Sequence, residues 1–100
     1  MTTQNIKVRK TARGIRLWIE GDRLSNAGFN RGVKYTRTIS HGVILLTLDI
    51  DGSKKVSGKT KSGKDHSIID ITASKPFDGF EIGQNVEVTY TQNSIVMTAQ

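Results

Sequence analysis

The sequence predicts a mainly β fold assembled from two similar units within one chain. The first observation is a pair of matching segments 51 residues apart, Gly28-Phe29-Asn30-Arg31-Gly32 and Gly79-Phe80-Glu81-Ile82-Gly83. The second is that each segment leads without a gap into a strand, a turn and another strand, over residues 33–46 and 84–97. Because a unit this short cannot bury its apolar side chains alone, we expect the two units to share one core.

The first unit is expected to begin with a strand over residues 14–20, where apolar and polar side chains alternate. Asp22 is a suitable N-cap for a short helix over residues 23–27. Gly28 can end that helix because glycine tolerates left-handed backbone at this position. Phe29 then enters the core.

A β-hairpin is expected next in each unit. In the first unit its strands cover residues 33–39 and 43–48, on either side of a turn that contains Gly42. In the second unit the return strand lies at residues 95–97, and Asn93 falls opposite Gly42 when the units are aligned. Glycine and asparagine most readily adopt positive φ, so both positions are predicted to be turns.

The start of the second unit departs from this simple alignment. Its first strand is expected over residues 67–72, with a shift of one residue relative to the 51-residue offset, because a slip of one exchanges the two faces of a strand. Pro76 can begin a second short helix or turn. Phe77 is expected to take the buried place that Leu24 has in the first unit.

Between the units lies a segment rich in Gly, Ser and Lys. Over residues 51–64 the only apolar side chain is Val56, which predicts a flexible loop or linker. The alternative is that part of the segment forms a hairpin arm around Val56. The predicted organisation is one domain, 1–100, with repeats over about 14–48 and 67–99 and a basic linker over about 51–66.

Composition narrows the possible classes of protein. There is no cysteine, so disulfides and thiolate metal sites are excluded. No apolar run approaches the roughly 20 residues that span a bilayer, and the polar start of the chain carries no apolar signal stretch. We therefore expect a cytoplasmic protein without a membrane partner.

The net charge of +6 is unevenly distributed. Residues 1–50 hold nine Lys/Arg and three Asp/Glu, whereas residues 68–100 hold one lysine and four acidic residues. A basic surface attracts polyanions, so this distribution favours nucleic acid as the partner, with the first unit and the linker as its site. The alternatives are a protein partner and a charge that serves solubility alone.

The candidate nucleic-acid-binding residues form two basic groups and one aromatic. In the first unit they are Lys7, Arg9, Lys10, Arg13, Arg16, Arg23, Arg31, Lys34 and Arg37. In the linker they are Lys54, Lys55, Lys59, Lys61 and Lys64, which could form a mobile polyanion-binding arm or a plain linker. Trp18, the only tryptophan, shares the outer strand face with Arg16, which suits base stacking, a protein interface or packing. Arg37 aligns with Val88 on the face expected to be buried.

Catalysis and metal binding find no support in the sequence. His41 and His66 have no metal-ligand spacing between them or with a glutamate. No Ser/His/Asp arrangement or carboxylate pair stands out, so we expect neither an enzyme nor a cofactor.

Residues 15–46 resemble the SymE-like branch of the AbrB/MazE/SpoVT superfamily of swapped-hairpin proteins. The resemblance rests on Ala27-Gly28-Phe29, Gly32, Gly42 and Val43-Ile44-Leu45-Leu46-Thr47. The second unit repeats Gly79-Phe80, Gly83 and Ile95-Val96-Met97-Thr98-Ala99, and together the matches cover about two thirds of the chain. The second unit departs from the family pattern at Lys75-Pro76-Phe77-Asp78 and lacks the basic residues of the first.

The resemblance implies a small swapped-hairpin pseudo-barrel, formed by two β-α(turn)-β-β repeats as a single-chain pseudo-dimer. It also implies binding of duplex DNA, in transcription regulation, in a toxin–antitoxin system or in toxin-like compaction. The alternative function is a protein-interaction module of phage or mobile-element origin that docks on a nucleic-acid-processing complex. The internal pseudo-dimer predicts a monomer or a weak dimer.

Overall fold

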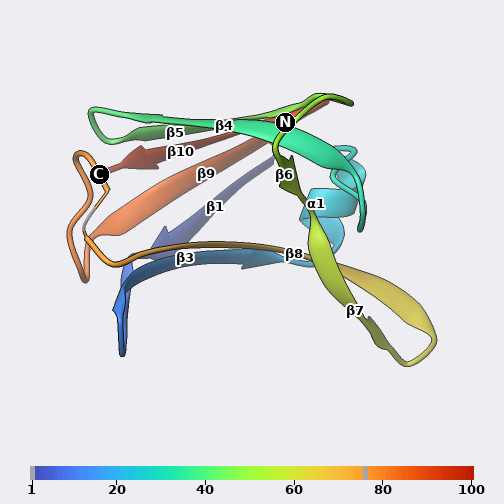
Figure 1. Ribbon diagram of the computed structural model, residues 1–100, viewed down its shortest axis with the longest axis horizontal. Coiled ribbons are helices and arrows are strands. Elements are labelled where there is room, and N and C mark those ends of the chain that lie inside the picture. The colour runs from blue at the N-terminus through green and yellow to red at the C-terminus, as the bar shows by residue number, and fades with distance from the viewer. Residues whose placement is uncertain (1, 76) are drawn as a thin grey trace.

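Two antiparallel β-sheets and one short helix make up the fold of this computed structural model, which describes residues 2–75 and 77–100 (Figure 1). The strands are β1 (Thr2–Lys7), β2 (Arg9–Thr11), β3 (Gly14–Glu20), β4 (Lys34–Ser40), β5 (Val43–Leu48), β6 (Lys54–Lys55), β7 (Ser57–Lys61), β8 (Lys64–Ala73), β9 (Asn85–Thr91) and β10 (Ser94–Ala99), and the helix is α1 (Asp22–Asn26). The predicted mainly β class is confirmed.

The two sheets face each other across the core. One has six strands in the order β1-β9-β10-β5-β4-β6, and the other has four in the order β2-β3-β8-β7. In Figure 1 the six-stranded sheet lies above the four-stranded sheet, and α1 lies at one end of the space between them. The chain passes from one sheet to the other at Val8, between β1 and β2, and at Val56, between β6 and β7.

The internal repeat appears as a pseudo-two-fold relation between the hairpins. Strands β4 and β9 have the same length and begin at Lys34 and Asn85, 51 residues apart, and β5 and β10 correspond in the same way. The two hairpins meet where β5 pairs with β10, and there Leu45 lies opposite its own equivalent, Val96. The pseudo-axis of the six-stranded sheet therefore passes between these two residues.

The first strands of the units show the predicted shift. Strand β3 pairs with β8 so that Leu17 lies opposite Ile71 and Ile19 opposite Ile69. This pattern is symmetric about the Trp18–Asp70 pair, so equivalent residues here are 52 apart rather than 51. The extra residue keeps the isoleucines of β8 facing the core, where Ile69 and Ile71 are buried.

Each hairpin turn docks on the other unit. The backbone N–H of Gly42 donates to the carbonyl of Asp78 (2.8 Å), and that of Asn93 donates to the carbonyl of Ala27 (3.0 Å). Both turn residues have the positive φ expected of them, 80° for Gly42 and 68° for Asn93. The hairpins are thus exchanged between the units, and the small β-rich pseudo-barrel is a single-chain pseudo-dimer.

The helix ends as predicted but begins differently. The N–H of Gly28 donates to Ser25 (3.0 Å) and that of Phe29 to Leu24 (2.8 Å), the two bonds of a Schellman motif in which glycine occupies the left-handed position. The N-cap is Gly21 and not Asp22, and no side chain caps the helix. Asp22 lies in the first turn, where its negative charge complements the helix dipole.

Of the two alternatives expected in the second unit, a short helix or a turn, the structure has turns. Residues 77–84 contain two turns and no helix, and Pro76 lies outside the described residues. Phe77 is nevertheless buried, as predicted, and its ring packs edge-on against Phe80 at 6.1 Å. The bond from the N–H of Phe80 to the carbonyl of Phe77 (2.9 Å) closes this corner.

The predicted flexible linker is wrong, because residues 54–61 are strands. Strand β6 pairs with β4, and β7 pairs with β8 to form a hairpin. Val56 is 2% exposed and exchanges backbone hydrogen bonds with Gly32 and Val33. The alternative, that part of the segment forms a hairpin arm, is the one that the structure adopts: the arm is β7–β8, and Val56 lies at its base.

The space between the sheets is filled by apolar side chains from both units. Phe29 and Phe80, the two equivalent phenylalanines, are almost fully buried. The largest fully buried aliphatic residues are Ile15, Leu17, Ile19, Leu24, Ile44, Leu46, Ile69, Ile71, Ile95 and Met97. Neither unit could bury its set alone, which is why the two must fold together.

Candidate nucleic-acid interface

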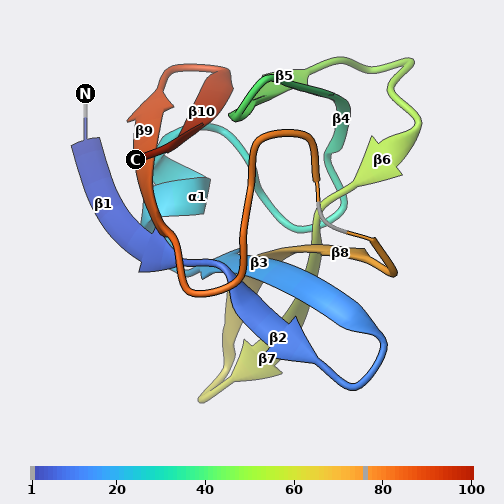
Figure 2. The same cartoon turned by 90° about the vertical axis from the view of Figure 1, so that its left-hand side faces the viewer.

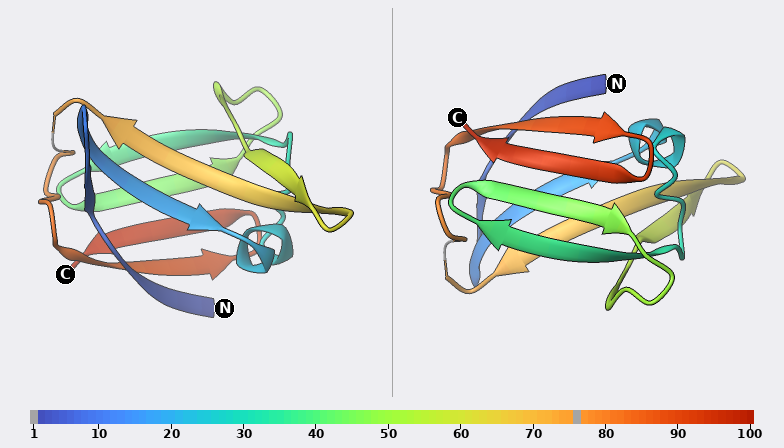
Figure 3. Two further views of the ribbon diagram at one scale, coloured as in Figure 1. Left: turned by 90° about the horizontal axis from the view of Figure 1, so that it is seen from below. Right: turned by 90° about the horizontal axis from the view of Figure 1, so that it is seen from above.

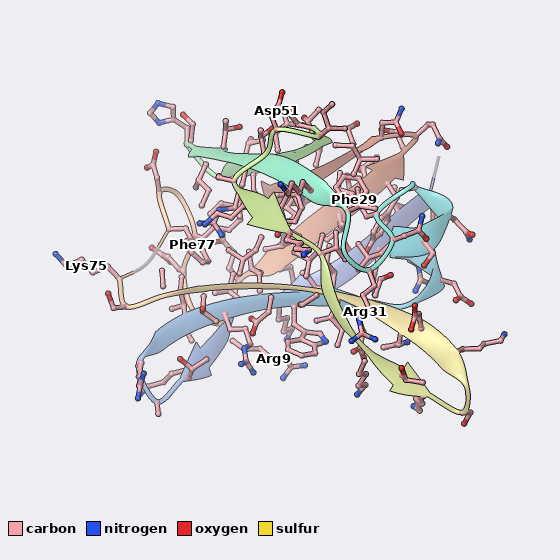
Figure 4. The ribbon with its side chains drawn as sticks, turned by 45° about the vertical axis from the view of Figure 1, so that its right-hand side comes forward. Arg9, Phe29, Arg31, Asp51, Lys75 and Phe77 are labelled. Atoms are coloured by element: carbon pink, nitrogen blue, oxygen red, sulfur yellow. The ribbon has the colours of Figure 1, made fainter. Side chains whose placement is uncertain are left out.

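The outer face of the four-stranded sheet collects many of the charged and aromatic candidates. Cross-strand partners share a face, so the register fixes which side chains lie there. They are Arg9, Arg16, Trp18, Glu20, Ser57, Lys59, Lys61, Lys64, His66, Ile68, Asp70 and Thr72. Figure 4 shows Arg9 projecting from this sheet away from the six-stranded sheet.

Two basic hairpins extend from opposite ends of this sheet, as Figure 1 and the left view of Figure 3 show; in Figure 2 the strands β2 and β7 both lie below the six-stranded sheet. The β2–β3 hairpin, the first arm, carries Arg13 in its turn and Lys10 just before the turn; Lys10 pairs with Ile15 and so projects from the opposite side of the hairpin to Arg9. The β7–β8 hairpin, the second arm, carries Lys61 and Lys64 on either side of its turn. Within the described chain, none of these four side chains has a carboxylate at salt-bridge distance.

The separation of the two arms follows from the length of β8. Lys64 and Ala73 are the first and last residues of this ten-residue strand, which corresponds to about 30 Å. The tip of the first arm lies beside the far end of β8, because Arg13 and Ala73 line the same hollow. The two basic tips are therefore about 30 Å apart along one face.

Arg16, Trp18 and Asp70 form the centre of the face. The Nε of Arg16 lies 3.1 Å from Oδ1 of Asp70, and the Arg16 guanidinium lies over the Trp18 ring, 5.2 Å from the ring centroid. Trp18 itself is 36% exposed, the position that its alternation with Ile19 predicts. The acidic second unit thus supplies the counter-charge for one arginine of the first.

A second polar pair lies next to this centre. The Nε2 of His66 is 3.3 Å from a carboxylate oxygen of Glu20. A hydrogen bond from Trp18 holds the pKa of Glu20 below its ordinary value; burial acts in the opposite direction, and His66 and Lys59 lower the pKa further. Trp18 is restrained at its ring face by the Arg16 guanidinium.

A hollow of about 300 Å³ lies beside Trp18. It is lined by Asn5, Ile6, Lys7, Arg9, Arg16 and Trp18. Four of these residues are sequence candidates, and they come from β1, β2 and β3. The bend at Val8 brings them together, because it turns the chain from one sheet to the other between Lys7 and Arg9.

The remaining candidates lie elsewhere. Arg23 is on α1, where it lines a hollow of about 650 Å³ together with Glu20 and Asp22. The Arg31 guanidinium contacts Asp65 (3.4 Å) and Thr60 (3.5 Å) against the second arm, near which Figure 4 also places it.

Another group follows the β4–β6 edge of the six-stranded sheet, where Lys34 pairs with Lys55 and Lys54 lies opposite Tyr35. Arg37 pairs with Leu46 and points to the core side of β4, as its alignment with Val88 predicts. It is half-buried, so its stem follows apolar neighbours while its charge reaches water.

The sequence placed Glu20 on the outer face with Arg16 and Trp18, but it did not indicate Glu20 or Asp70 as residues of the site. Their outward position could be read from strand alternation, but their partners could not, because β3 and β8 are about 50 residues apart in the chain. In the described ranges, no cluster of three or more potential metal ligands occurs. The only described helix, α1, is too short to cross a membrane.

Comparisons with protein-family models, with curated proteins and with solved structures found no match to this chain.

Proposed function

We propose that this chain is a non-enzymatic protein that binds duplex DNA through the outer face of its four-stranded sheet. The observation that carries the proposal is the pair of basic arms at the two ends of that face. A DNA duplex is a linear array of negative charge, and two separated cationic tips on one face suit such an array better than they suit a compact anion.

The spacing of the arms supports a duplex as the partner. A turn of B-DNA spans about 34 Å, close to the separation of about 30 Å between the arm tips. Two-stranded β-ribbons fit the major groove, and each arm is such a ribbon. In this arrangement the arms contact successive turns while Arg9 and Lys59 lie over the backbone between them.

The contacts we propose are mainly to phosphates. The flexible lysine and arginine side chains at the arm tips can reach phosphates of the DNA backbone. In the described residues this face consists of strands, so no helix lies on it to read base edges. Binding should therefore depend steeply on salt and weakly on sequence, with a log–log slope of about −5 for six phosphates engaged. Such behaviour suits the AbrB/SymE-like roles that the sequence resemblance implies, regulation or DNA compaction in the cytoplasm.

The test is fluorescence anisotropy with a labelled random-sequence duplex over a range of salt concentrations. The test variant is Lys10→Gln/Arg13→Gln/Lys61→Gln/Lys64→Gln, which neutralises both arm tips. The matched control, Lys34→Gln/Lys54→Gln/Lys55→Gln/Lys75→Gln, removes the same number of charges from other surfaces.

We expect the arm variant to lose most of its affinity and the magnitude of its slope to fall by about 3 to 4, since each phosphate contact adds about 0.9. The control should retain its slope to within about one contact. Equal losses in the two variants would show that net charge, and not the arms, drives binding. The absence of wild-type binding at low salt would remove the proposal.

A protein partner is the second candidate, and the opposite sheet favours it. The central strands β5 and β10 contain no charged residue, and Val43 and Leu45 on their outer face are each 39% exposed. An uncharged, partly apolar face on a basic protein suits a protein surface better than DNA. A stoichiometric protein partner together with no DNA binding would support this function.

A further inference from the structure

The hollow beside Trp18 has features that the fold itself does not require. In the second unit the equivalents of Arg16 and Trp18 are Ile68 and Asp70, given the 52-residue offset of the first strands. The equivalent of Arg9 is Ser57, because Val8 and Val56 correspond. The same backbone therefore folds without an aromatic or an arginine at these places, so their presence in the first unit calls for another explanation.

The charges around the hollow are only partly balanced. Arg9 and Arg16 lie directly opposite each other on β2 and β3, which places two like charges on neighbouring strands. Asp70 offsets the charge of Arg16, at 3.1 Å. Arg9 and Lys7 have no carboxylate at salt-bridge distance in the described part of the chain. The rim therefore offers two cations to an anion.

The aromatic side of the hollow is restrained before any ligand arrives. The Arg16 guanidinium covers part of the Trp18 ring, and Asp70, 3.1 Å from Arg16, helps to hold that guanidinium in place. More than a third of the side chain still faces solvent. An indole held in one orientation can stack against a planar group with little further loss of conformational freedom.

We infer that this hollow binds one unpaired nucleotide of a DNA strand, with its base stacked on Trp18 and its phosphate between Lys7 and Arg9. The inference rests on the proposed DNA binding and adds a preference for a single-stranded end or a displaced base. A volume of about 300 Å³ lies at the lower end of the range for small-molecule sites, which suits one nucleotide. Each chain has one such site, because the second unit lacks the residues.

Trp18 is the only tryptophan, so its fluorescence reports on this hollow alone. The experiment titrates the full chain with a blunt duplex, with the same duplex carrying a three-nucleotide single-stranded extension, and with thymidine monophosphate. Anisotropy of labelled DNA measures binding in parallel with Trp18 emission.

We expect the extended duplex to quench Trp18 and to bind more tightly than the blunt duplex, by a factor between about 5 and 150, the range for stacking one base. The blunt duplex should bind and leave Trp18 emission nearly unchanged. Trp18→Leu should lose the preference for the extension, so that it binds the extended and the blunt duplex with equal affinity. Trp18→Phe, which retains an aromatic ring, should restore most of the preference.

Lys7→Gln/Arg9→Gln should weaken binding of the extended duplex more than binding of the blunt duplex. If the extended duplex saturates the protein by anisotropy with no quenching and no preference, the inference is overturned while the proposed DNA binding stands. If neither duplex binds, both fail together. Quenching by thymidine monophosphate as strong as that by the extended duplex, at equal nucleotide concentration, would overturn the assignment to a DNA strand and assign the hollow to free nucleotides.

Discussion

Val8 and Val56 occupy the same place in the two halves of the fold, although they are 48 residues apart in the chain. Val8 exchanges backbone bonds with Gly83 and Gln84, and Val56 makes the same bonds with Gly32 and Val33. Each valine is at most 2% exposed and marks the passage of the chain between the two sheets. The repeating unit therefore begins before each valine, and residues 54–61 belong to the second unit.

Shortening either valine should destabilise the protein to a similar extent. Val8→Ala and Val56→Ala each remove two buried carbons, so we expect each to lower the free energy of unfolding by about 2 kcal/mol. Chemical denaturation measures the change. Ile50→Ala is the control, because Ile50 is 88% exposed and should matter little. A neutral Val56→Ala would contradict the structural role of this segment.

The equivalent glycines at the two corners should differ in their tolerance of alanine. At Gly28, with φ of 93°, an added Cβ would lie 3.0 Å from Cδ1 of Leu48, which can shift. At Gly79, with φ of 83°, an added Cβ would overlap the backbone of Gly42, which cannot shift to make room. Gly63, with φ of 79°, has open space around it and isolates the cost of positive φ, about 1 to 2 kcal/mol.

We therefore expect Gly63→Ala to be the mildest of the three variants, Gly28→Ala to be intermediate and Gly79→Ala to be the most destabilising. Thermal or denaturant unfolding provides the ranking. Equal losses at Gly63 and Gly79 would mean that the close approach of Gly79 and Gly42 contributes nothing beyond backbone strain.

Tyr90 should ionise late in an alkaline titration. Burial raises its pKa to about 12, and its hydroxyl donates a 2.7 Å hydrogen bond to Oε1 of Gln4. Burial also raises the pKa of Tyr35. Because folding raises the pKa of Tyr90, the protonated phenol stabilises the folded state. This stabilisation is fully present below the unfolded-state pKa of about 10 and is lost as the pH rises toward 12.

Absorbance of phenolate should therefore rise above pH 10 in the folded protein. Tyr90→Phe should remove the component near pH 12 and leave that of Tyr35. A single transition near pH 10 under folding conditions would contradict the burial of both rings.

Glu20 should make the protein sensitive to acid. The pKa of Glu20 is lowered in the folded state, chiefly by the hydrogen bond from Trp18. The ionised carboxylate therefore stabilises the folded state at pH values above the unfolded-state pKa of about 4.3, and this stabilisation is lost as the pH falls through the lower folded-state pKa. We expect unfolding free energies to drop less between pH 5 and pH 3 in Glu20→Gln than in the wild type. Identical pH profiles would show that the Trp18–Glu20 contact does not stabilise the fold.

Much of the fold could be predicted from short-range pattern. The alternation at residues 14–20 predicted both the strand and its buried face, and the position of Gly28 predicted the end of α1. The matching turns at Gly42 and Asn93 followed from residue types that tolerate positive φ. The N-cap at Asp22 was wrong, because Gly21, with φ of 95°, already turns the chain into the helix.

The lysine-rich segment is where pattern was least informative. In residues 54–61 only one residue of eight is buried, so the sequence has the pattern of a linker. These edge strands are held by backbone pairing with β4 and β8 and not by burial of their own side chains. The same limit applies to Asp70, whose role depends on a strand far away in the chain.

By itself the sequence determined the β class, the repeated hairpins, the shift of one residue between the first strands and the outward position of Arg16 and Trp18. These are local properties, set by side-chain alternation and by backbone preferences within a few residues. Only the tertiary structure decided that the hairpins exchange between units, that Asp70 faces Trp18, and that Lys7 and Arg9 line one hollow beside that tryptophan. These relations depend on which distant strands pair, and pairing is selected by the burial of the whole core.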